Sequence, residues 1–365
     1  MSSTETIAPK VPKAPRVETD PRLDPRIKAA FAGIPTGMQQ PNVNSREELL
    51  AQEYSEKGLA FNAYQNKVFD AMDSEEIAPS ASLTVRTETF TSAPDGNTVK
   101  IQYIRPDNDE ILPCIYYIHG GRMAFSSCYL GNYKTWGRMI AAGGLAVAMV
   151  DFRNCVHPDS SPEVAPFPAG LNDCVAGLKW VHSNATALGI DPARIVVAGE
   201  SGGGNLSLAL GMKLKQDGNL GLIQGIYAMC PYIAGEWPLP QNPSSTDNEG
   251  ILISVQNNRS TMAYGIEAFN DKNPLAWPGF AQRNDVEGFP PVVISVNECD
   301  PLLDEGLGFY RLLVKSGVSA RCRQLMGMCH GIEAMPLICP DITFATASDI
   351  ASFVGWLEKS RKGNS

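Results

Sequence analysis

The stretch that most constrains the fold of this chain is Gly199-Glu200-Ser201-Gly202-Gly203, a Gly-x-Ser-x-Gly pattern. The apolar run 195–198 before it is typical of a buried strand, and leucines recur at helical spacing after it, at 206, 210 and 214. A strand, a tight turn and a helix in this order present the serine above the end of a sheet. The glycines beside the serine suit a turn that leaves no room for side chains. Because the pattern also occurs in ordinary glycine-rich turns, its meaning depends on the rest of the chain.

From about residue 83 onward, expected strands alternate with expected helices. The strands are expected at 83–90, 99–104, 114–118, 145–151, 195–198, 223–229, 292–296 and 320–325. The helices are expected at 134–142, 169–187, 305–316 and 343–359, with a further one that follows the Gly-x-Ser-x-Gly turn and runs to about 216. A hairpin followed by repeated βα units predicts an α/β fold, with a mostly parallel sheet covered by helices on both faces. Ligands of such sheets bind at the carboxyl ends of the strands.

Two segments fall outside this alternation and predict a chain of four parts. Residues 1–80 form an N-terminal part, and residues 231–285, with a helix expected at 255–269, form an irregular insertion. The α/β core then consists of residues 81–230 and 286–365.

The N-terminal part reads as a proline-rich arm followed by helix. The arm, to about residue 30, is interpreted either as an unstructured tail or as a strap over the body. Residues 45–72 are expected to be helical, with a capping box formed by Ser45 and Glu48. The helix carries an apolar stripe that we expect to pack against another part of the protein: Tyr54, Leu59, Phe61, Tyr64, Val68 and Phe69.

Composition excludes several classes of function. The net charge of −9 argues against binding to nucleic acid or to anionic membrane surfaces. The nine cysteines include no Cys-x-x-Cys pair, so free thiols in a reducing compartment are expected, and no metal-ligand spacing is present. The start lacks the pattern of a secretory signal, and the longest apolar run, 139–150, is too short to insert into a membrane. A cytoplasmic protein without cofactor or metal is expected, and the sequence leaves open whether it forms a homo-oligomer.

A serine hydroxyl is a weak nucleophile, so it needs a base, and an acid must hold that base in one tautomer. The histidines of the chain are His119, His157, His182 and His330. The first belongs to a glycine-rich loop, the second lies in a proline-rich loop, and the third lies in the middle of a helix. His330 follows the last expected strand, and serine, acid, histidine is the chain order of hydrolases on this fold. We therefore predict Ser201 as the nucleophile and His330 as the base.

Three carboxylates follow the expected strand at 292–296: Glu298, Asp300 and Asp304. Asp300 precedes a proline, which favours an extended backbone and suits a loop residue that reaches an imidazole. Asp304 is better placed to begin the next helix, where negative charge is favourable. We therefore predict Asp300 as the acid.

The loop His119-Gly120-Gly121-Arg122 follows another expected strand. When a serine attacks an acyl group, the carbonyl oxygen becomes an anion, which fixed backbone N–H groups stabilise. Glycines allow such a loop to approach closely, although an ordinary tight turn would also use them. The predicted oxyanion hole comprises Gly120, Gly121, Arg122 and Gly202, the last because it directly follows the serine.

In these runs the chain resembles the hormone-sensitive-lipase-like family of α/β hydrolases, and within it the brefeldin A esterase type. The matching runs are His119-Gly120-Gly121, Asp151-Phe152-Arg153-Asn154, Pro166-Phe167-Pro168 with Asp173, Gly199 to Leu206, Asp300 to Gly306, and His330-Gly331. The resemblance implies an α/β-hydrolase fold with an eight-stranded sheet and a helical cap built from the N-terminal part and the insertion. It also implies Asp300 as the acid. The chain departs from the family at Arg122, where a third glycine is usual.

These features predict a serine carboxylesterase that hydrolyses short- to medium-chain or apolar small-molecule esters through an acyl-enzyme. The same triad would also serve a hydrolase of lactones, amides or carbamates, because the acyl-enzyme chemistry is shared. A non-catalytic small-molecule binder on this fold is the third interpretation, although such proteins typically lack one member of the triad.

Overall fold

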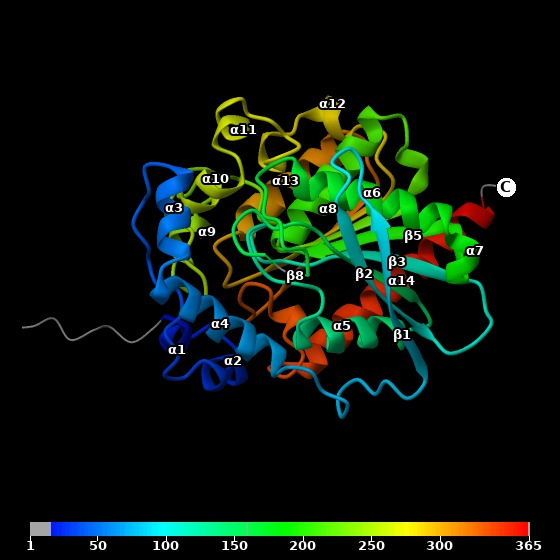
Figure 1. Ribbon diagram of the computed structural model, residues 1–365, viewed down its shortest axis with the longest axis horizontal. Helices are drawn as coiled ribbons and strands as arrows, with labels where there is room; N and C mark the ends of the chain where they lie inside the picture. The colour runs from blue at the N-terminus through cyan, green and yellow to red at the C-terminus, as the bar shows by residue number, and fades with distance from the viewer. Residues whose placement is uncertain (1–15, 159, 364–365) are drawn as a thin grey trace, which may run out of the picture.

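An eight-stranded sheet runs through the centre of the protein in the computed structural model, which describes residues 16–158 and 160–363 (Figure 1). The strands are Leu83–Thr91 (β1), Thr98–Pro106 (β2), Leu112–Ile118 (β3), Ala146–Asp151 (β4), Ile190–Glu200 (β5), Gly225–Met229 (β6), Val292–Asn297 (β7) and Ala320–Leu325 (β8). Their order across the sheet is β1-β2-β4-β3-β5-β6-β7-β8. β2 is antiparallel to both of its neighbours, and every pair from β4 to β8 is parallel. The predicted mostly parallel sheet is confirmed.

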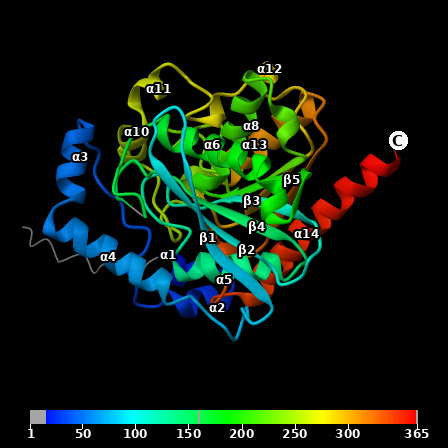
Figure 2. The same cartoon turned by 45° about the vertical axis from the view of Figure 1, so that its right-hand side comes forward.

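Helices cover both faces of the sheet (Figures 1 and 2). The helices are Arg16–Thr19 (α1), Pro25–Ala30 (α2), Arg46–Glu53 (α3), Glu56–Asp70 (α4), Gly131–Ala141 (α5), Ala169–Ser183 (α6), Ala185–Leu188 (α7), Gly202–Gln216 (α8), Ser244–Asp247 (α9), Arg259–Tyr264 (α10), Ile266–Asn270 (α11), Arg283–Val286 (α12), Leu303–Lys315 (α13) and Pro340–Gly363 (α14), with 3-10 turns at Leu220–Leu222 (η1), Pro278–Phe280 (η2) and Ile332–Ala334 (η3). α5 and α14 pack on one face, and α6, α8 and α13 pack on the other. Within the described ranges, no helix is both long enough and apolar enough to span a membrane.

The central strands are apolar along their whole length because both of their faces are covered. In β3, Cys114, Tyr116 and Ile118 belong to the hydrophobic cluster under α6 and α8. The alternate residues Ile115 and Tyr117 belong to the cluster under α5 and α14. Successive strand side chains point to opposite faces, so one continuous apolar run supplies two cores.

The structure decides between the two interpretations of the N-terminal arm. Residues 1–15 of the arm lie outside the described residues, but the arm from residue 16 onward folds into α1 and α2. Asp24 caps α2 by accepting a hydrogen bond from Arg26 N, and Pro25 occupies the first helical turn, where its missing N–H costs nothing. Ile27 is fully buried. The arm is therefore a strap over the body, because its few apolar residues are buried there.

The helical stretch 45–72 is two helices, since Ser55 interrupts it and caps α4 through a hydrogen bond from Gly58 N. At the start of α3, Ser45 accepts from Glu48 N as predicted, but the Glu48 carboxylate accepts from Asn44 N, one residue earlier than a capping box requires. The apolar stripe was expected to be packed, and much of it is exposed: Tyr54 43%, Leu59 46%, Phe61 43% and Tyr64 50%. The helix α4 has no buried residue, and among the described elements its main contacts are with its neighbours α3 and α5.

The insertion lies beside α3 (Figure 1). The helix expected at 255–269 is two short helices, α10 and α11, because Gly265 takes an extended conformation between them. Arg259 of α10 donates to both Gln52 and Glu53 at the end of α3 at 2.7 Å. The N-terminal part and the insertion are thus in contact.

Candidate active site

Ser201 lies on the turn between β5 and α8, with a left-handed φ of 57° and ψ of −117°. Such a conformation is costly for a residue with a side chain, on the order of 1–3 kcal/mol, and persists only where its surroundings impose it. The neighbouring glycines show how the surroundings impose this conformation on Ser201. A Cβ atom on Gly203 would lie 1.9 Å from Ile118 O, and one on Gly202 would lie 2.9 Å from Arg122 N. The turn is therefore pressed against the end of β3 and the loop that follows it.

Ser201, His330 and Asp300 form a chain of hydrogen bonds. His330 Nε2 lies 2.8 Å from Ser201 Oγ, and His330 Nδ1 lies 2.8 Å from Asp300 Oδ2. Asp300 is fully buried, and its second carboxylate oxygen accepts from Leu302 N at 2.9 Å. In this geometry Nδ1–H donates to the carboxylate, which leaves Nε2 free to accept the serine proton.

The three residues come from three separate loops at one edge of the sheet. Ser201 follows β5, Asp300 follows β7 and His330 follows β8. These strands are parallel, so their carboxyl ends meet at that edge. The structure thus brings together the three residues that the sequence singled out.

His119, the histidine of the glycine loop, is placed differently. It is buried and stacks on Phe152 with ring centroids 4.4 Å apart. Its Nδ1 lies 2.9 Å from the Gly120 carbonyl oxygen, and burial lowers the pKa of its imidazole. His119 is therefore a neutral packing residue at the base of the loop.

The loop 119–122 faces the serine turn, but its amides are not equivalent. Gly120 N donates to a carboxylate oxygen of Glu200 at 2.7 Å. That amide is engaged, which departs from the expectation that Gly120 contributes to an oxyanion hole. The amides of Gly121 and Arg122 form no hydrogen bond with a described residue. Gly202 begins α8, so its N–H also lacks an acceptor within the helix.

Glu200 lies beneath this loop and is buried. Its carboxylate accepts hydrogen bonds from the phenols of Tyr117 and Tyr133 in addition to the Gly120 amide. Burial raises the pKa of Glu200 to about 7, against the opposing effect of the phenol donors. The carboxylate therefore links the serine turn to the glycine loop. Neither tyrosine was identified from the sequence, because a tyrosine in a buried strand or helix carries no local signal of such a contact.

Arg122 occupies the position where the family usually has glycine. Its φ of 58° is left-handed, which explains the usual preference for glycine there. Its guanidinium donates to the carbonyl oxygen of Ser254, in the insertion, at 3.1 Å. The side chain therefore ties the glycine loop to the insertion, and the backbone N–H remains available.

The insertion is also anchored directly to the serine turn. Tyr232 N donates to Ser201 O at 3.0 Å. Glu305, at the start of α13, accepts from Ile233 N and from the Trp237 indole, both at 2.7 Å. The insertion therefore begins from a fixed point next to the serine.

One group of side chains has the spacing of a metal site. Cys230, Asp300 and His330 place ligand atoms within 4.8 Å of one another. Burial raises the pKa of the Cys230 thiol, which opposes the thiolate that a metal would need. The carboxylate and the imidazole already bind each other. These residues therefore fit a packed triad better than a metal ion.

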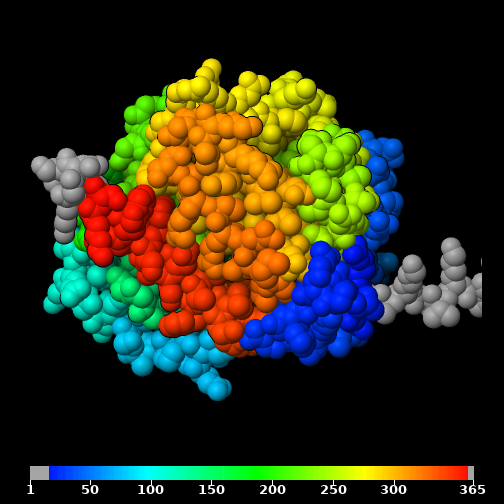
Figure 3. All heavy atoms as spheres, turned by 180° about the vertical axis from the view of Figure 1, so that it is seen from behind, coloured from blue at the N-terminus to red at the C-terminus, as the bar shows by residue number. Residues whose placement is uncertain are grey.

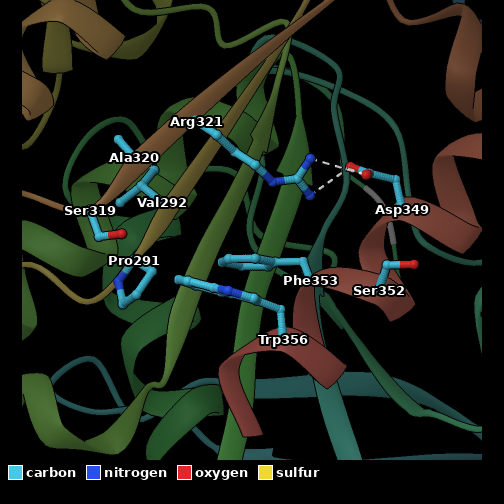
Figure 4. A pocket seen from close by; sticks show the side chains of 9 residues that line it. All are labelled: Pro291, Val292, Ser319, Ala320, Arg321, Asp349, Ser352, Phe353 and Trp356. Carbon is cyan, nitrogen blue, oxygen red and sulfur yellow. Dashed lines mark hydrogen bonds and ion pairs between the residues drawn. The ribbon is translucent and has the colours of Figure 1, made fainter. Parts of the chain in front are cut away.

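A cavity of about 350 Å³ lies at the opposite edge of the sheet (Figure 4). It is lined by the beginnings of β7 and β8 and by α14, where Phe353 and Trp356 stack. Its two charged residues, Arg321 and Asp349, pair with each other at 3.0 Å. The cavity therefore contributes no group to the chemistry around Ser201.

Comparison with known proteins agrees with this geometry. The sequence model of a family described as having the alpha/beta hydrolase fold matches residues 115–334. Carboxylesterase NlhH of Mycobacterium tuberculosis is 31% identical over 300 residues, which cover 78% of this chain and 90% of that protein. Among solved structures, esterase Est22 is 57% identical with a TM-score of 0.92 over 93% of this chain and 99% of its own.

Brefeldin A esterase, described as a bacterial homologue of human hormone sensitive lipase, is 32% identical with a TM-score of 0.84. The match covers 95% of this chain and 99% of that one. The chain therefore belongs to the α/β hydrolase fold family, in the hormone-sensitive-lipase-like group that includes brefeldin A esterase.

Proposed function

We propose that this protein is a serine carboxylesterase that hydrolyses carboxylic esters through an acyl-enzyme on Ser201. The observation that carries the proposal is the hydrogen-bonded chain from Ser201 through His330 to Asp300, beside the amides of Gly121 and Arg122, which no described residue accepts from. The relatives named carboxylesterase and esterase support esters rather than lactones, amides or carbamates as substrates. An aligned triad has no role in a protein that only binds.

In the first half of the reaction, His330 Nε2 takes the proton of Ser201 Oγ as that oxygen attacks the ester carbonyl. Asp300 holds the imidazole in the required tautomer and stabilises its positive charge. The amides of Gly121, Arg122 and Gly202 are the proposed donors to the oxyanion, each removed donor typically costing about 3–4 kcal/mol of barrier. The tetrahedral intermediate collapses, and the alcohol leaves with the proton from His330.

In the second half, His330 activates a water molecule that attacks the acyl-enzyme, and the acid is released from Ser201. The same oxyanion donors serve both halves. Apart from the ester and this water molecule, the groups that act in these steps are the side chains and amides named above. We propose short- to medium-chain or apolar small-molecule esters as substrates, with the cap formed by residues 1–80 and 231–285 shaping the pocket.

The proposal is tested by Ser201→Ala and His330→Ala. Each should reduce hydrolysis of a short-chain p-nitrophenyl ester by about 10⁴-fold or more, because each removes a group that acts in every turnover. The far-ultraviolet circular dichroism should match that of the wild type. Covalent labelling by a fluorophosphonate should occur in the wild type and not in Ser201→Ala. Normal turnover in either variant would refute the mechanism.

We also propose a cytoplasmic location. The nine cysteines are free thiols, and all except Cys322 are buried. Free thiols in such number are typical of a reducing compartment.

A further inference from the structure

The loop that carries Asp300 is held from outside by one segment of the insertion, residues 244–255, which we call the clasp. Asn248 of the clasp donates through its side-chain amide to the carbonyl oxygens of both Glu298 and Asp300, at 3.0 Å each. Ser244 N donates to the Asp304 carboxylate at 2.7 Å, and Ser244 Oγ accepts from Asp304 N. At its other end, the clasp accepts the Arg122 hydrogen bond at Ser254 O. One short segment therefore contacts two loops. The first is the loop 298–304 that carries Asp300, which we call the acid loop, and the second is the glycine loop 119–122.

Within the acid loop, Leu303 N donates to Asp300 O at 3.1 Å. The Asn248 amide adds a second donor at that oxygen and a donor at Glu298 O. Pro301 directly follows Asp300 and has no N–H. Carbonyl groups buried without a donor cost about 1–3 kcal/mol each. Asn248 is 2% exposed, so water has little access to replace its amide.

Asn248 is itself fixed from behind by the N-terminal strap. Arg22 donates to Asn248 Oδ1 at 2.9 Å. Its guanidinium is in turn oriented by two hydrogen bonds to Asp20, at 3.0 and 2.7 Å. Both the donor and the acceptor ends of the Asn248 amide are therefore used.

The strap packs against the acid loop and against the loop that carries His330, which we call the histidine loop. A small hydrophobic cluster forms where they meet. Its members from the strap are Val17, Leu23, Ile27 and Phe31, and its members from the body include Ile251, Cys299, Met328, Cys329 and Ile332. In Figure 3 the dark blue strap lies against the orange and red segments. The strap thus packs behind the acid loop that Asn248 binds, and behind the histidine loop as well.

We propose that Asn248 is a positioning residue for the reaction, and that Arg22 holds it in place. The inference rests on the proposed roles of Asp300 and His330. By fixing the carbonyl of Asp300, Asn248 sets the direction in which the carboxylate meets the imidazole. A misplacement of about 1 Å at such a contact can lower the rate by about 100-fold.

The first test is Asn248→Ala, assayed with a p-nitrophenyl ester. We expect kcat to fall by about 10- to 100-fold and KM to change by less than about threefold, since Asn248 acts through Asp300 and not on the substrate. Asn258→Ala is the matched control. Asn258 belongs to the same insertion and also uses both ends of its amide, binding Val43 N and O, but it does not touch the acid loop. Its kcat should stay within about twofold of the wild type.

A double-mutant cycle separates positioning from general stability. In an Asp300→Asn background, Asn248→Ala should have little further effect on kcat, because the group that it positions is already lost. If Asn248→Ala lowers kcat by the same factor in both backgrounds, or no more than Asn258→Ala does, the inference is wrong.

Arg22→Gln is a second variant that leaves Asn248 in place. We expect kcat to fall by about three- to tenfold, again only when Asp300 is present. Arg26→Gln is its control, because Arg26 lies in the same strap, is similarly exposed, and pairs with Asp24 and Asp341 instead. Equal kcat values for the two variants would overturn the role of Arg22. Ester hydrolysis by the wild type and its loss in Ser201→Ala would still support the proposed function if these tests fail.

Discussion

Glu200 directly precedes Ser201 in the chain, yet it is the residue whose chemistry is least visible in the sequence. In the structure it is 4% exposed and bound by two phenols and an amide of the glycine loop. Burial, which depends on residues far apart in the chain, decides its protonation.

The raised pKa of Glu200, about 7 against an ordinary value of 4.5, gives a prediction for stability. A folded-state pKa above the unfolded value stabilises the fold at low pH, and this stabilisation is lost as the pH rises through about 7. Between pH 5 and pH 8 the wild type should therefore lose roughly 2–3 kcal/mol of unfolding free energy relative to Glu200→Gln. Urea denaturation of both proteins at the two pH values measures this difference. A difference that does not change with pH would contradict the assignment.

Asp300 and Asp304 lie in one loop and allow a direct comparison. Asp300 binds His330, whereas Asp304 accepts from Ser244 N at 2.7 Å. We expect Asp300→Asn to lower kcat by about 10³- to 10⁴-fold, because the imidazole loses its preferred tautomer. Asp304→Asn should lower it by less than about tenfold. Steady-state kinetics on a p-nitrophenyl ester decides between them, and a larger loss at Asp304 would reassign the acid.

At the scale of elements, the unit β5–turn–α8 depends on close contact with β3. Glycine is required where the backbones meet and is only tolerated where they do not. Gly203 lies at such a contact, while Gly308, on the exposed side of α13, has nothing within 4 Å of an added Cβ.

Two alanine substitutions in helices should therefore have opposite effects. Gly203→Ala should destabilise the protein by about 3 kcal/mol or more, since its Cβ would lie 1.9 Å from Ile118 O and backbone must move. Gly308→Ala should stabilise it by about 0.5–1 kcal/mol through helix propensity. Equilibrium urea denaturation gives both values. Equal effects would show that the contact at Gly203 does not constrain the turn.

At the scale of the whole molecule, the N-terminal strap belongs to the folded body, whereas α4 is a surface helix. Ile27 of the strap is fully buried, and Leu59 of α4 is 46% exposed. The strap and α4 have a similar share of apolar residues. Their different burial therefore comes from the surface that each segment packs against.

Ile27→Ala should lower the free energy of unfolding by about 2–4 kcal/mol, because it leaves a cavity among Cys299, Met328 and their neighbours. Leu59→Ala should cost less than about 1 kcal/mol, since its side chain is largely in water already. Thermal and urea unfolding of the two variants test this. A loss at Leu59 equal to that at Ile27 would mean that α4 is covered in solution.

The sequence by itself determined the sheet, the serine turn and the order of the three residues of the triad. These follow from local signals: apolar runs of strand length, glycines around Ser201, and a proline after Asp300 that holds the chain extended. Signals of this kind survive because they depend on the backbone of a few consecutive residues. The predictions of a single helix at 255–269 and of a packed stripe on α4 were wrong, since periodicity alone does not show where a helix breaks or what covers it.

Only the tertiary structure decided which groups meet. Tyr117 and Tyr133 bind Glu200, Asn248 binds the acid loop, and Gly120 is engaged by a carboxylate. The partners in these contacts are between 50 and 83 residues apart in the chain, and no periodicity connects them. Such contacts form because buried polar atoms must find partners once the fold removes water. The same requirement sends the Arg122 side chain to the insertion while its backbone stays beside Ser201.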